Sequence, residues 1–476
     1  MGKSREYTIF LSCAAEDTDT TRKWYEGMKK RELDVTFDRV DINPKKWESQ
    51  VNKAISRSQF LVICISKKAL VDPSGGNKGF RDTELNKLYN MVCDIPHSEF
   101  TIIPVMLEDC GHSSEFLNGP YIYNMFQGME EELDRLSLNL GGRSLSDANA
   151  VDKRSEDEGV FDCLMGKAAI AYYAVDFDRS LNVLISVSVK VSDTYEVWYD
   201  KGIVLGCLGR HDEAVEALDH ATKIKSDAHR SWYKKGVFLD CLNRMEDAIN
   251  AYDRAISLKN DDYESWYGKG VALDSMDNSA GALEAYDNVT RIKPDHSDAW
   301  NNKGITLGNM HRLEDAIEAF DLAIKIRPDN HEAWYNMGIV LGSMNRLEEG
   351  VEAFDQSIKL APGDYVAWFN KGAFLGRLDR LEDTVEVLNH AISIKSDGEE
   401  AWYQKGVVLG KLNRHEEAIS SFDQAIMINP ADHNVWHRIG ISLDVLGHHD
   451  KAVKAYDKAA KLKLSEQGDN KIGSDL

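Results

Sequence analysis

The stretch SDAWNNKGITLGNMHRLEDAIEAFDLAIKIRPDN, residues 297–330, decides the fold of most of this chain, because variants of it recur along the sequence. Tryptophan is its fourth residue. Tryptophan returns every 34 residues without a shift, at Trp198, Trp232, Trp266, Trp300, Trp334, Trp368, Trp402 and Trp436. A fixed period of this kind is typical of a helix–turn–helix solenoid, in which each repeat buries its apolar face only against its neighbours. Such an array is a surface for binding, so chemistry is expected in the other third of the chain.

Further positions keep the same phase when each repeat is numbered with tryptophan at position 4. Position 8 is glycine and position 11 leucine in all eight repeats, position 20 is small, and position 24 is aromatic or leucine. Positions 4, 8 and 11 share one face of a first helix, and positions 20, 24 and 27 share one face of a second. This pattern predicts that the tryptophans are core residues and not a ladder for ligands.

In these positions the array resembles the tetratricopeptide repeat, and a degenerate ninth repeat is predicted at 161–192, with Leu164 and Ala168 in the tryptophan and glycine positions. The resemblance implies a groove lined by the first helices, which binds a protein or peptide. Side-chain amides there could hydrogen-bond an extended peptide backbone between aromatic neighbours; alternatively, these residues merely suit a wet helix surface. The predicted groove residues, at positions 5 and 6, are Tyr335, Asn302, Asn336, Phe369 and Asn370.

Net charge separates the two parts of the chain. Residues 1–135 carry 18 basic and 22 acidic side chains, a net charge of −4, whereas the remainder carries 39 and 57, a net charge of −18. An acidic array argues against nucleic acid and against an anionic membrane as partners. It favours a basic peptide or protein, unless the acidity serves only solubility.

The seven cysteines are scattered and show no paired spacing. This distribution predicts a reducing compartment, with neither a disulfide framework nor a metal site. No apolar stretch approaches transmembrane length, and the N-terminus lacks the apolar segment of a signal peptide. We therefore expect a cytoplasmic protein.

The N-terminal third alternates short apolar runs with segments of helical period. The runs are Tyr7–Leu11, Leu33–Phe37, Phe60–Ile65 and Phe100–Leu107, and the helical segments are Thr18–Arg31, Trp47–Ser56 and Arg81–Cys93. Alternation of this kind predicts an α/β domain with a flavodoxin-like parallel sheet covered on both faces. Ligands of such sheets bind at the carboxyl ends of the strands, so the loops after Leu11, Phe37, Ile65 and Leu107 are the candidate site.

Five pieces of this region, in consistent order over residues 5–140, resemble a TIR domain (Toll/interleukin-1 receptor type) of the bacterial and archaeal kind. Ile9–Asp17 is similar to the opening strand and loop, and Phe37–Trp47 to the second strand with the BB loop. Phe60–Ser66 is similar to the third strand. The start of the αC helix and the fourth strand correspond to Lys78–Leu85 and Ile102–Cys110.

Many TIR domains of this kind hydrolyse NAD, and the resemblance implies that Glu84 is the catalytic carboxylate, four residues after the aromatic Phe80. An anion beside the ribose would stabilise the oxocarbenium-like state formed as nicotinamide leaves. Without the resemblance, Glu84 is a solvated acid near a helix start. NAD is then a substrate, and no cofactor or metal is expected. The substrate-binding residues implied are Ser12, Cys13, Asp38, Arg39, Trp47, Ser66 and Phe80, although Asp38 could be a turn residue and Trp47 a core aromatic.

The predicted organisation is a TIR domain at 1–140, a polar linker at 141–160, a solenoid of about nine repeats at 161–464 and a polar tail at 465–476. The expected function is a sensor–effector, in which the repeats recognise a protein or peptide and the TIR domain, activated by self-association, hydrolyses NAD in defence or stress signalling. Two alternatives stay open. One is a non-enzymatic adapter, and the other is an enzyme that makes cyclic ADP-ribose.

Overall fold

The computed structural model divides into two compact parts, Met1–Asn260 and Asp261–Leu476, which are described separately. The structure describes residues 8–14, 17–31, 33–42, 47–55, 58, 60–65, 88, 101–106, 123–124, 156–173, 176–190 and 194–472. The predicted helix at Arg81–Cys93 therefore lies outside the described residues, apart from the buried Leu88.

A parallel sheet forms the N-terminal domain, as the sequence predicts. Its strands are β1 (Thr8–Cys13), β2 (Asp34–Phe37), β3 (Phe60–Ile65), β4 (Thr101–Met106) and β5 (Tyr123–Asn124). The described strands are ordered β2-β1-β3-β4-β5, with all four pairings parallel. The strand order reverses beside β1, and in sheets of this kind the carboxyl edge at such a point is where the crevice for a ligand lies.

Both faces of the sheet are buried, which explains why its strands are almost continuously apolar. On one face, Ile9 and Leu11 pack in a cluster with Trp24 of helix α1 (Thr18–Lys30). On the other, Phe10 and Ile63 belong to a cluster with Val51 of helix α3 (Trp47–Ile55). The short helix α2 (Asp38–Asp41) directly follows β2 and lies at the carboxyl edge.

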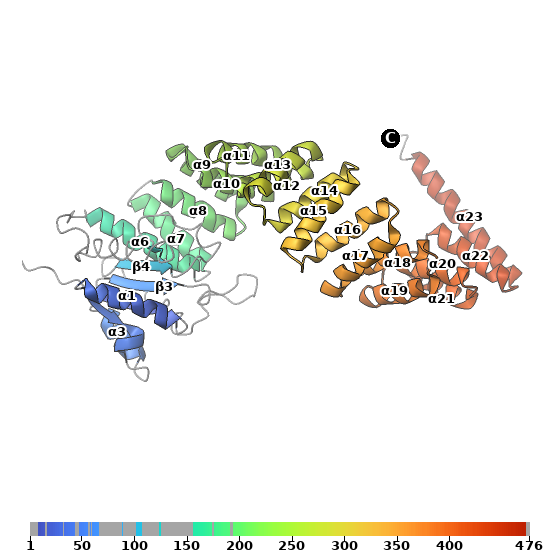
Figure 1. The fold of residues 1–476 in the computed structure, drawn as a ribbon, viewed down its shortest axis with the longest axis horizontal. Coiled ribbons are helices and arrows are strands. Elements are labelled where there is room, and N and C mark those ends of the chain that lie inside the picture. Colours follow the sequence, from blue (N-terminus) through green and yellow to red (C-terminus); the bar gives the residue numbers. More distant parts are fainter. Residues whose placement is uncertain are drawn as a thin grey trace, which may run out of the picture. The chain divides into compact units, whose positions relative to one another are not determined.

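The first helical hairpin, α6 (Glu156–Tyr173) with α7 (Phe177–Lys190), is built into this domain. Helix α6 packs against β4, and its fully buried Met165 and Ala168 belong to the same apolar cluster as Phe10 and Ile63 (Figure 1). Helix α6 also begins at Glu156, so the last five residues of the predicted linker at 141–160 are helical. The degenerate repeat is therefore a layer of the α/β domain as well as the first repeat.

This packing predicts that a fragment ending at residue 140 is unstable. Without α6, the apolar surface around β4 is left in water, where each Å² of exposed apolar area costs about 25 cal/mol. A fragment 1–190, which keeps α6 and α7, is expected to be monomeric and to unfold cooperatively. Fragment 1–140 is expected to aggregate or to melt without a transition. Circular dichroism with size-exclusion chromatography of both fragments makes the comparison, and equal stability of the two would contradict the packing role of α6.

The remaining helices form eight more hairpins, so the described residues contain nine hairpins in all, in agreement with the predicted repeat count. The last helix continues to Ile472, through most of the predicted tail at 465–476. None of the described helices is long and apolar enough to span a membrane. The hairpins are α8 (Tyr195–Cys207) with α9 (His211–Ile224), α10 (His229–Cys241) with α11 (Met245–Leu258), α12 (Tyr263–Ser275) with α13 (Ser279–Ile292), α14 (Ser297–Asn309) with α15 (Leu313–Ile326), α16 (His331–Ser343) with α17 (Leu347–Leu360), α18 (Tyr365–Arg377) with α19 (Leu381–Ile394), α20 (Glu399–Lys411) with α21 (His415–Ile428), and α22 (His433–Val445) with α23 (His449–Ile472).

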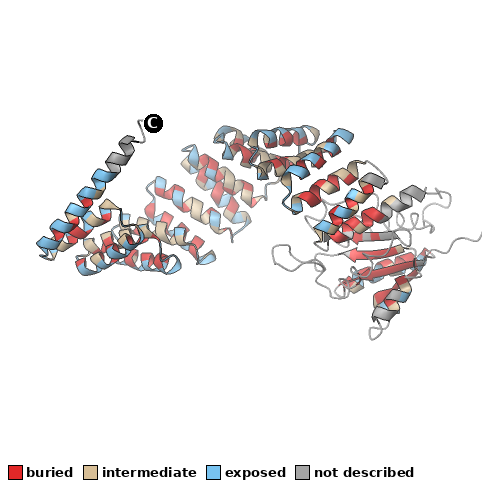
Figure 2. Ribbon diagram, turned by 180° about the vertical axis from the view of Figure 1, so that it is seen from behind, coloured by how far each residue is buried: buried red, intermediate tan, exposed pale blue. Residues whose placement is uncertain are grey.

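Close helix contact explains the invariant glycine at position 8. A Cβ atom added at Gly304 would lie 2.6 Å from the ring of Phe320, the fully buried residue at position 24 of the same repeat. The other seven glycines at this position meet their own position-24 side chains at 2.4–3.0 Å. In Figure 2, buried residues recur along the helices of the array, between exposed ones.

The tryptophans are less buried than the sequence predicts, because all eight are half-buried, although six of them pack against the apolar clusters of the array. Trp300 is typical: its indole N–H donates to the carbonyl of Pro294 at 2.9 Å, and Lys303 Nζ lies 4.8 Å from its ring centroid. Pro294 belongs to the preceding repeat. The indole N–H makes the same bond to the preceding repeat at Trp232, Trp368, Trp402 and Trp436, so position 4 joins successive repeats. The packing inside each hairpin is carried by positions 8 and 24.

Positions 12 and 24 vary together from repeat to repeat. Position 12 is aspartate wherever position 24 is tyrosine, at Asp240 with Tyr252, Asp274 with Tyr286 and Asp444 with Tyr456. In the five repeats with phenylalanine or leucine at position 24, position 12 is glycine. The Tyr286 hydroxyl donates to Asp274 at 2.9 Å, and that of Tyr456 donates to Asp444 at 3.1 Å. In these two repeats the phenol at position 24 thus has its acceptor at position 12 of the same repeat.

Candidate functional site

The carboxyl ends of β1 and β2 bring four of the predicted substrate-binding residues together. Ser12 and Cys13 end β1, whereas Asp38 and Arg39 begin α2 directly after β2. Because parallel strands end at the same edge of a sheet, these residues meet at the crevice where the strand order reverses. Their position is the one that the sequence indicated for a ligand site.

Two sets of hydrogen bonds join these loops. The Ser12 hydroxyl donates to Asp38 Oδ2 at 2.5 Å, and both side chains are buried. Arg39 donates to the Cys13 carbonyl with Nε at 3.1 Å and with Nη2 at 2.8 Å. Buried polar groups that are hydrogen-bonded to one another hold a fixed geometry. One carboxylate and one guanidinium are therefore held in fixed positions at the carboxyl ends of β1 and β2.

Asp41 takes a different role from Asp38. Its carboxylate accepts from the backbone N–H of Phe37 at 2.8 Å and from the Tyr25 hydroxyl at 3.4 Å. These bonds close the turn between β2 and α2, as a turn aspartate does. The carboxylate also helps raise the pKa of Tyr25, second to the burial of the phenol. Asp41 is thus the turn residue, whereas Asp38 is hydrogen-bonded to Ser12 across the two loops.

Cys13 does not have the properties of a nucleophile. Burial raises the pKa of its thiol to about 12, and the pKa of Cys64, which lies opposite it in β3, is raised well above the usual value for the same reason. A thiol with such a pKa stays protonated and unreactive at neutral pH. Cys13 is therefore a packing residue whose backbone carbonyl, and not its sulfur, contributes to the cluster.

The other predicted residues of this site cannot be placed in the same detail. Trp47 is the first residue of α3, with a side chain outside the described residues. Ser66, Phe80 and Glu84 also lie outside the described residues. The roles implied for these four remain predictions.

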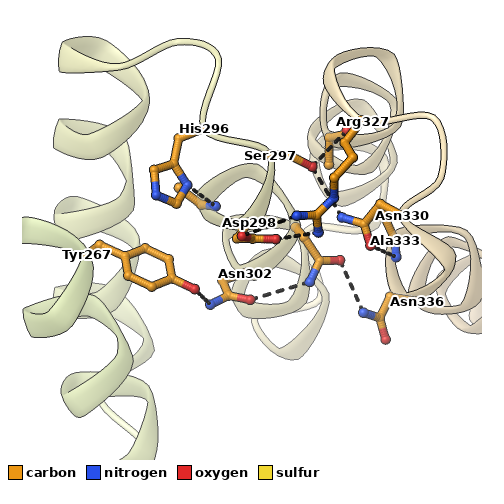
Figure 3. Close-up of polar contacts among 12 residues, drawn as sticks. Tyr267, His296, Ser297, Asp298, Asn302, Arg327, Asn330, Ala333 and Asn336 are labelled. Carbon is orange, nitrogen blue, oxygen red and sulfur yellow. Dashed lines mark hydrogen bonds and ion pairs between the residues drawn. The ribbon is translucent and has the colours of Figure 1, made fainter. Parts of the chain in front are cut away.

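The predicted groove residues of the array lie on successive first helices and are hydrogen-bonded from repeat to repeat. Asn302 Nδ2 donates to the Tyr267 hydroxyl at 3.1 Å, as Figure 3 shows. Asn370 Nδ2 makes the same bond to the Tyr335 hydroxyl at 3.1 Å, and Asn336 Nδ2 donates to Asn301 Oδ1 at 3.2 Å. Each amide at position 6 thus reaches position 5 of the preceding repeat. The side chain of Phe369 has no hydrogen-bond acceptor, so this row of inter-repeat hydrogen bonds ends at Asn370.

Other polar residues of the same network were not predicted from the sequence. Asp298 pairs with Arg327 at 2.6 Å within one repeat, and Asn330 donates to the Ser297 hydroxyl at 3.2 Å (Figure 3). His296 accepts from the backbone N–H of Ala299 at 3.1 Å, and burial lowers its pKa, in keeping with a neutral ring. These residues cap and join helices; their signal in the sequence is their position at repeat boundaries.

Apolar side chains accompany the amides on the same helices. Ile305 and Ile339 occupy position 9, one turn after position 5, and each is 37% exposed. Residues four apart share a face of a helix. The groove surface therefore combines exposed isoleucines with a preorganised row of amides and phenols.

Comparison with known families agrees with this architecture. Residues 9–137 match the model described as "TIR domain". Three tetratricopeptide repeat models match residues 297–330 and 399–432, residues 199–264 and 242–296, and residues 331–364 and 433–465. The chain is a TIR domain fused to a tetratricopeptide repeat array. The repeat at residues 365–398 falls between these matches, yet it forms the hairpin α18 with α19.

Solved structures similar to this TIR–tetratricopeptide chain are tetratricopeptide proteins. MamA is 22% identical with a TM-score of 0.34, over 35% of this chain and 96% of its own. YrrB, titled a TPR protein with an unusual peptide-binding site, is 18% identical with a TM-score of 0.36, over 39% of this chain and 96% of its own. A repeat protein from Parabacteroides merdae is 14% identical with a TM-score of 0.40, over 53% of this chain and all of its own. No curated protein matches the chain.

Proposed function

We propose that the TIR domain hydrolyses NAD between nicotinamide and ribose when copies of the chain associate, and that the repeat array controls this step by binding a protein or peptide. The observation that carries the enzymatic part is the buried Ser12–Asp38 pair, 2.5 Å apart, which joins the carboxyl ends of β1 and β2. Buried polar groups at the carboxyl edge of a parallel sheet mark a ligand site. The match of residues 9–137 to the TIR family model supports this domain as the enzymatic part of the proposal.

Glu84 supplies the catalytic carboxylate in this proposal. The nicotinamide ring of NAD is cationic and becomes neutral when it leaves, so the bond breaks with little help from a general acid. The step instead needs an anion beside the ribosyl cation. Arg39 brings a guanidinium to the crevice, and guanidinium groups suit the pyrophosphate of NAD. Asp38, fixed by Ser12, forms the polar wall next to it. Water then attacks the ribosyl carbon to give ADP-ribose.

The test is incubation of the purified full chain with NAD at high protein concentration and with a crowding agent. Chromatography separates the products. Nicotinamide with ADP-ribose supports the proposal, and a cyclic product means that the same cleavage makes a signal molecule. No consumption of NAD in associated protein would favour the adapter role, in which the domain only binds other TIR domains.

The binding part of the proposal rests on the groove. Its amides and phenols are held by inter-repeat hydrogen bonds, so a ligand meets a preorganised surface and little ordering opposes binding. The net charge of −18 over residues 136–476 favours a basic partner by long-range attraction.

Alanine at Tyr335, Asn336, Phe369 and Asn370 is expected to weaken the binding of a basic peptide about tenfold or more, because several central contacts are lost together. Fluorescence polarisation with a panel of synthetic peptides, graded from basic to acidic, measures this. Asn389→Ala, on the exposed side of α19, is the matched control and should bind as the wild type does. Equal binding by the groove variant would move the partner to another surface.

A further inference from the structure

The last helix of the array keeps a stacking face that no other described hairpin covers. Position 21 is apolar in every repeat, and Val215, Val351 and Val385 at this position are 7%, 7% and 8% exposed. Val453 at the same position of α23 is 57% exposed. Helix α23 also continues to Ile472, past the point where the second helix of inner repeats ends, and Leu464 is 69% exposed. A terminal repeat is expected to have a polar outer face.

The charge of this helix is reversed relative to the other repeats. Position 19 is acidic in six of the seven preceding 34-residue repeats and position 22 in five of them, but in α23 these positions are Lys451 and Lys454. Lys458 and Lys461 continue the row along the helix, and all four lysines are exposed. An apolar stripe thus lies beside a lysine row, on an array that is otherwise strongly acidic.

We propose that α23 docks onto a second copy of this chain, along the row of glutamates at position 22 of the middle repeats. Glu318, Glu352 and Glu386 are exposed there on α15, α17 and α19. The lysine row of α23 meets these carboxylates, and Val453 loses its contact with water. The contact joins two different surfaces, so it either closes reciprocally in a two-fold dimer or extends from copy to copy as a ring or filament.

The composition of the α23 surface favours a protein over a nucleic acid as the occupant. Asp450 and Asp457 lie exposed within the lysine row, where they would repel a phosphate backbone. Val453 and Leu464 need an apolar contact, which a polyphosphate does not offer. A second copy supplies acidic helices together with the exposed Leu322 on α15, which is 38% exposed.

Docking of α23 supplies a surface for the association step of the proposed function, but this docking does not depend on NAD cleavage. Sedimentation velocity of the full chain, over a range of concentrations and without NAD, is the test. The wild type is expected to form assemblies that grow with concentration and dissolve at high salt, since exposed charge pairs are screened.

The decisive variant is Lys451→Glu with Lys454→Glu, which restores the charge usual at positions 19 and 22. It is expected to raise the dissociation constant about tenfold or more, because two attractive contacts become repulsive. Lys223→Glu with Lys259→Glu makes the same change in charge at two other exposed positions, one in α9 and one directly after α11, and should associate as the wild type does.

A charge swap identifies the acceptor surface. Glu352→Lys with Glu386→Lys should also reduce association, and a mixture of this variant with Lys451→Glu/Lys454→Glu should recover it. Circular dichroism confirms that each variant is folded. Wild-type protein that stays monomeric at low salt, or a Lys451→Glu/Lys454→Glu variant that assembles normally, would overturn the proposal. Absence of recovery in the mixture would overturn the glutamate row as acceptor. Because the readout is assembly, an inactive TIR domain leaves the result intact.

Discussion

Glu84→Gln is expected to lower the rate of NAD cleavage by roughly 10²–10³-fold, the usual effect of removing one group that stabilises transition-state charge. Glutamine keeps the size and hydrogen-bonding capacity of the side chain but removes the negative charge. The ribosyl cation would then form beside a neutral amide. The Michaelis constant is expected to change little, because the carboxylate acts on charge that develops only in the transition state.

The matched control is Glu26→Gln, the same substitution at an exposed position of α1. This control should retain full activity. Both variants should unfold at the same temperature as the wild type. An active wild type whose Glu84→Gln variant cleaves NAD at a similar rate would show that another group stabilises the cation. Asp38 would then be the first residue to test, since its carboxylate is fixed at the crevice by Ser12.

Loss of the Tyr286–Asp274 pair is expected to destabilise the middle of the array by about 1–3 kcal/mol, the cost of leaving a buried polar group without its partner. Tyr286 is almost fully buried, and Asp274 accepts both from its hydroxyl and from Thr306 of the next repeat at 3.0 Å. Asp274→Ala leaves the phenol without this acceptor, and Tyr286→Phe removes one of two donors from the carboxylate.

The double variant tests the coupling directly. Asp274→Ala with Tyr286→Phe should cost less than the two single changes added together, by about 1 kcal/mol, because neither group is then left alone. Amide exchange in α12 and α13 measures the local opening, since long repeat arrays do not unfold in one step. Glu284→Ala, at an exposed position of α13, is the control. Simple additivity would show that the pair is not coupled.

Acidity should reduce the effect of Tyr286→Phe. Burial raises the pKa of Asp274, while the hydrogen bonds from Tyr286 and Thr306 lower it. Removing the phenol therefore raises this pKa further. As the pH falls and Asp274 takes up a proton, the missing donor matters less, so the difference in stability between variant and wild type should shrink.

The period of the sequence was sufficient to predict the array, because each repeat is fixed by contacts within itself and with its neighbours. Gly304 against Phe320 is such a contact, sixteen residues apart in the chain. The tryptophans were assigned to the core because their position shares a helix face with Gly304. That reasoning missed the bond from Trp300 to Pro294 and the cover provided by Lys303, which hold the ring at a boundary between repeats.

Long-range packing limited the rest of the prediction. The parallel sheet followed from the alternation of strands and helices. The rule that parallel strands end at one edge brought the loops after Leu11 and Phe37 together, and the resemblance to TIR domains named Ser12 and Asp38 in them. The contact of α6 with β4 had no local signal, because an apolar residue such as Met165 suits either a repeat or a sheet. The amides of the groove were predicted as a binding surface. Their hydrogen bonds, such as Asn370 to Tyr335, join residues 35 apart in the chain and could be identified only in the structure.

The linked choice at positions 12 and 24 bears on how such an array can change in length. Both members of each pair lie within one period, so duplication or loss of a whole period copies or deletes the phenol together with its carboxylate. A crossover between positions 12 and 24 of unlike repeats would instead join a tyrosine to a glycine, or an aspartate to a phenylalanine. Recombination at the boundaries between hairpins therefore keeps each pair intact, whereas recombination inside unlike hairpins separates its two members.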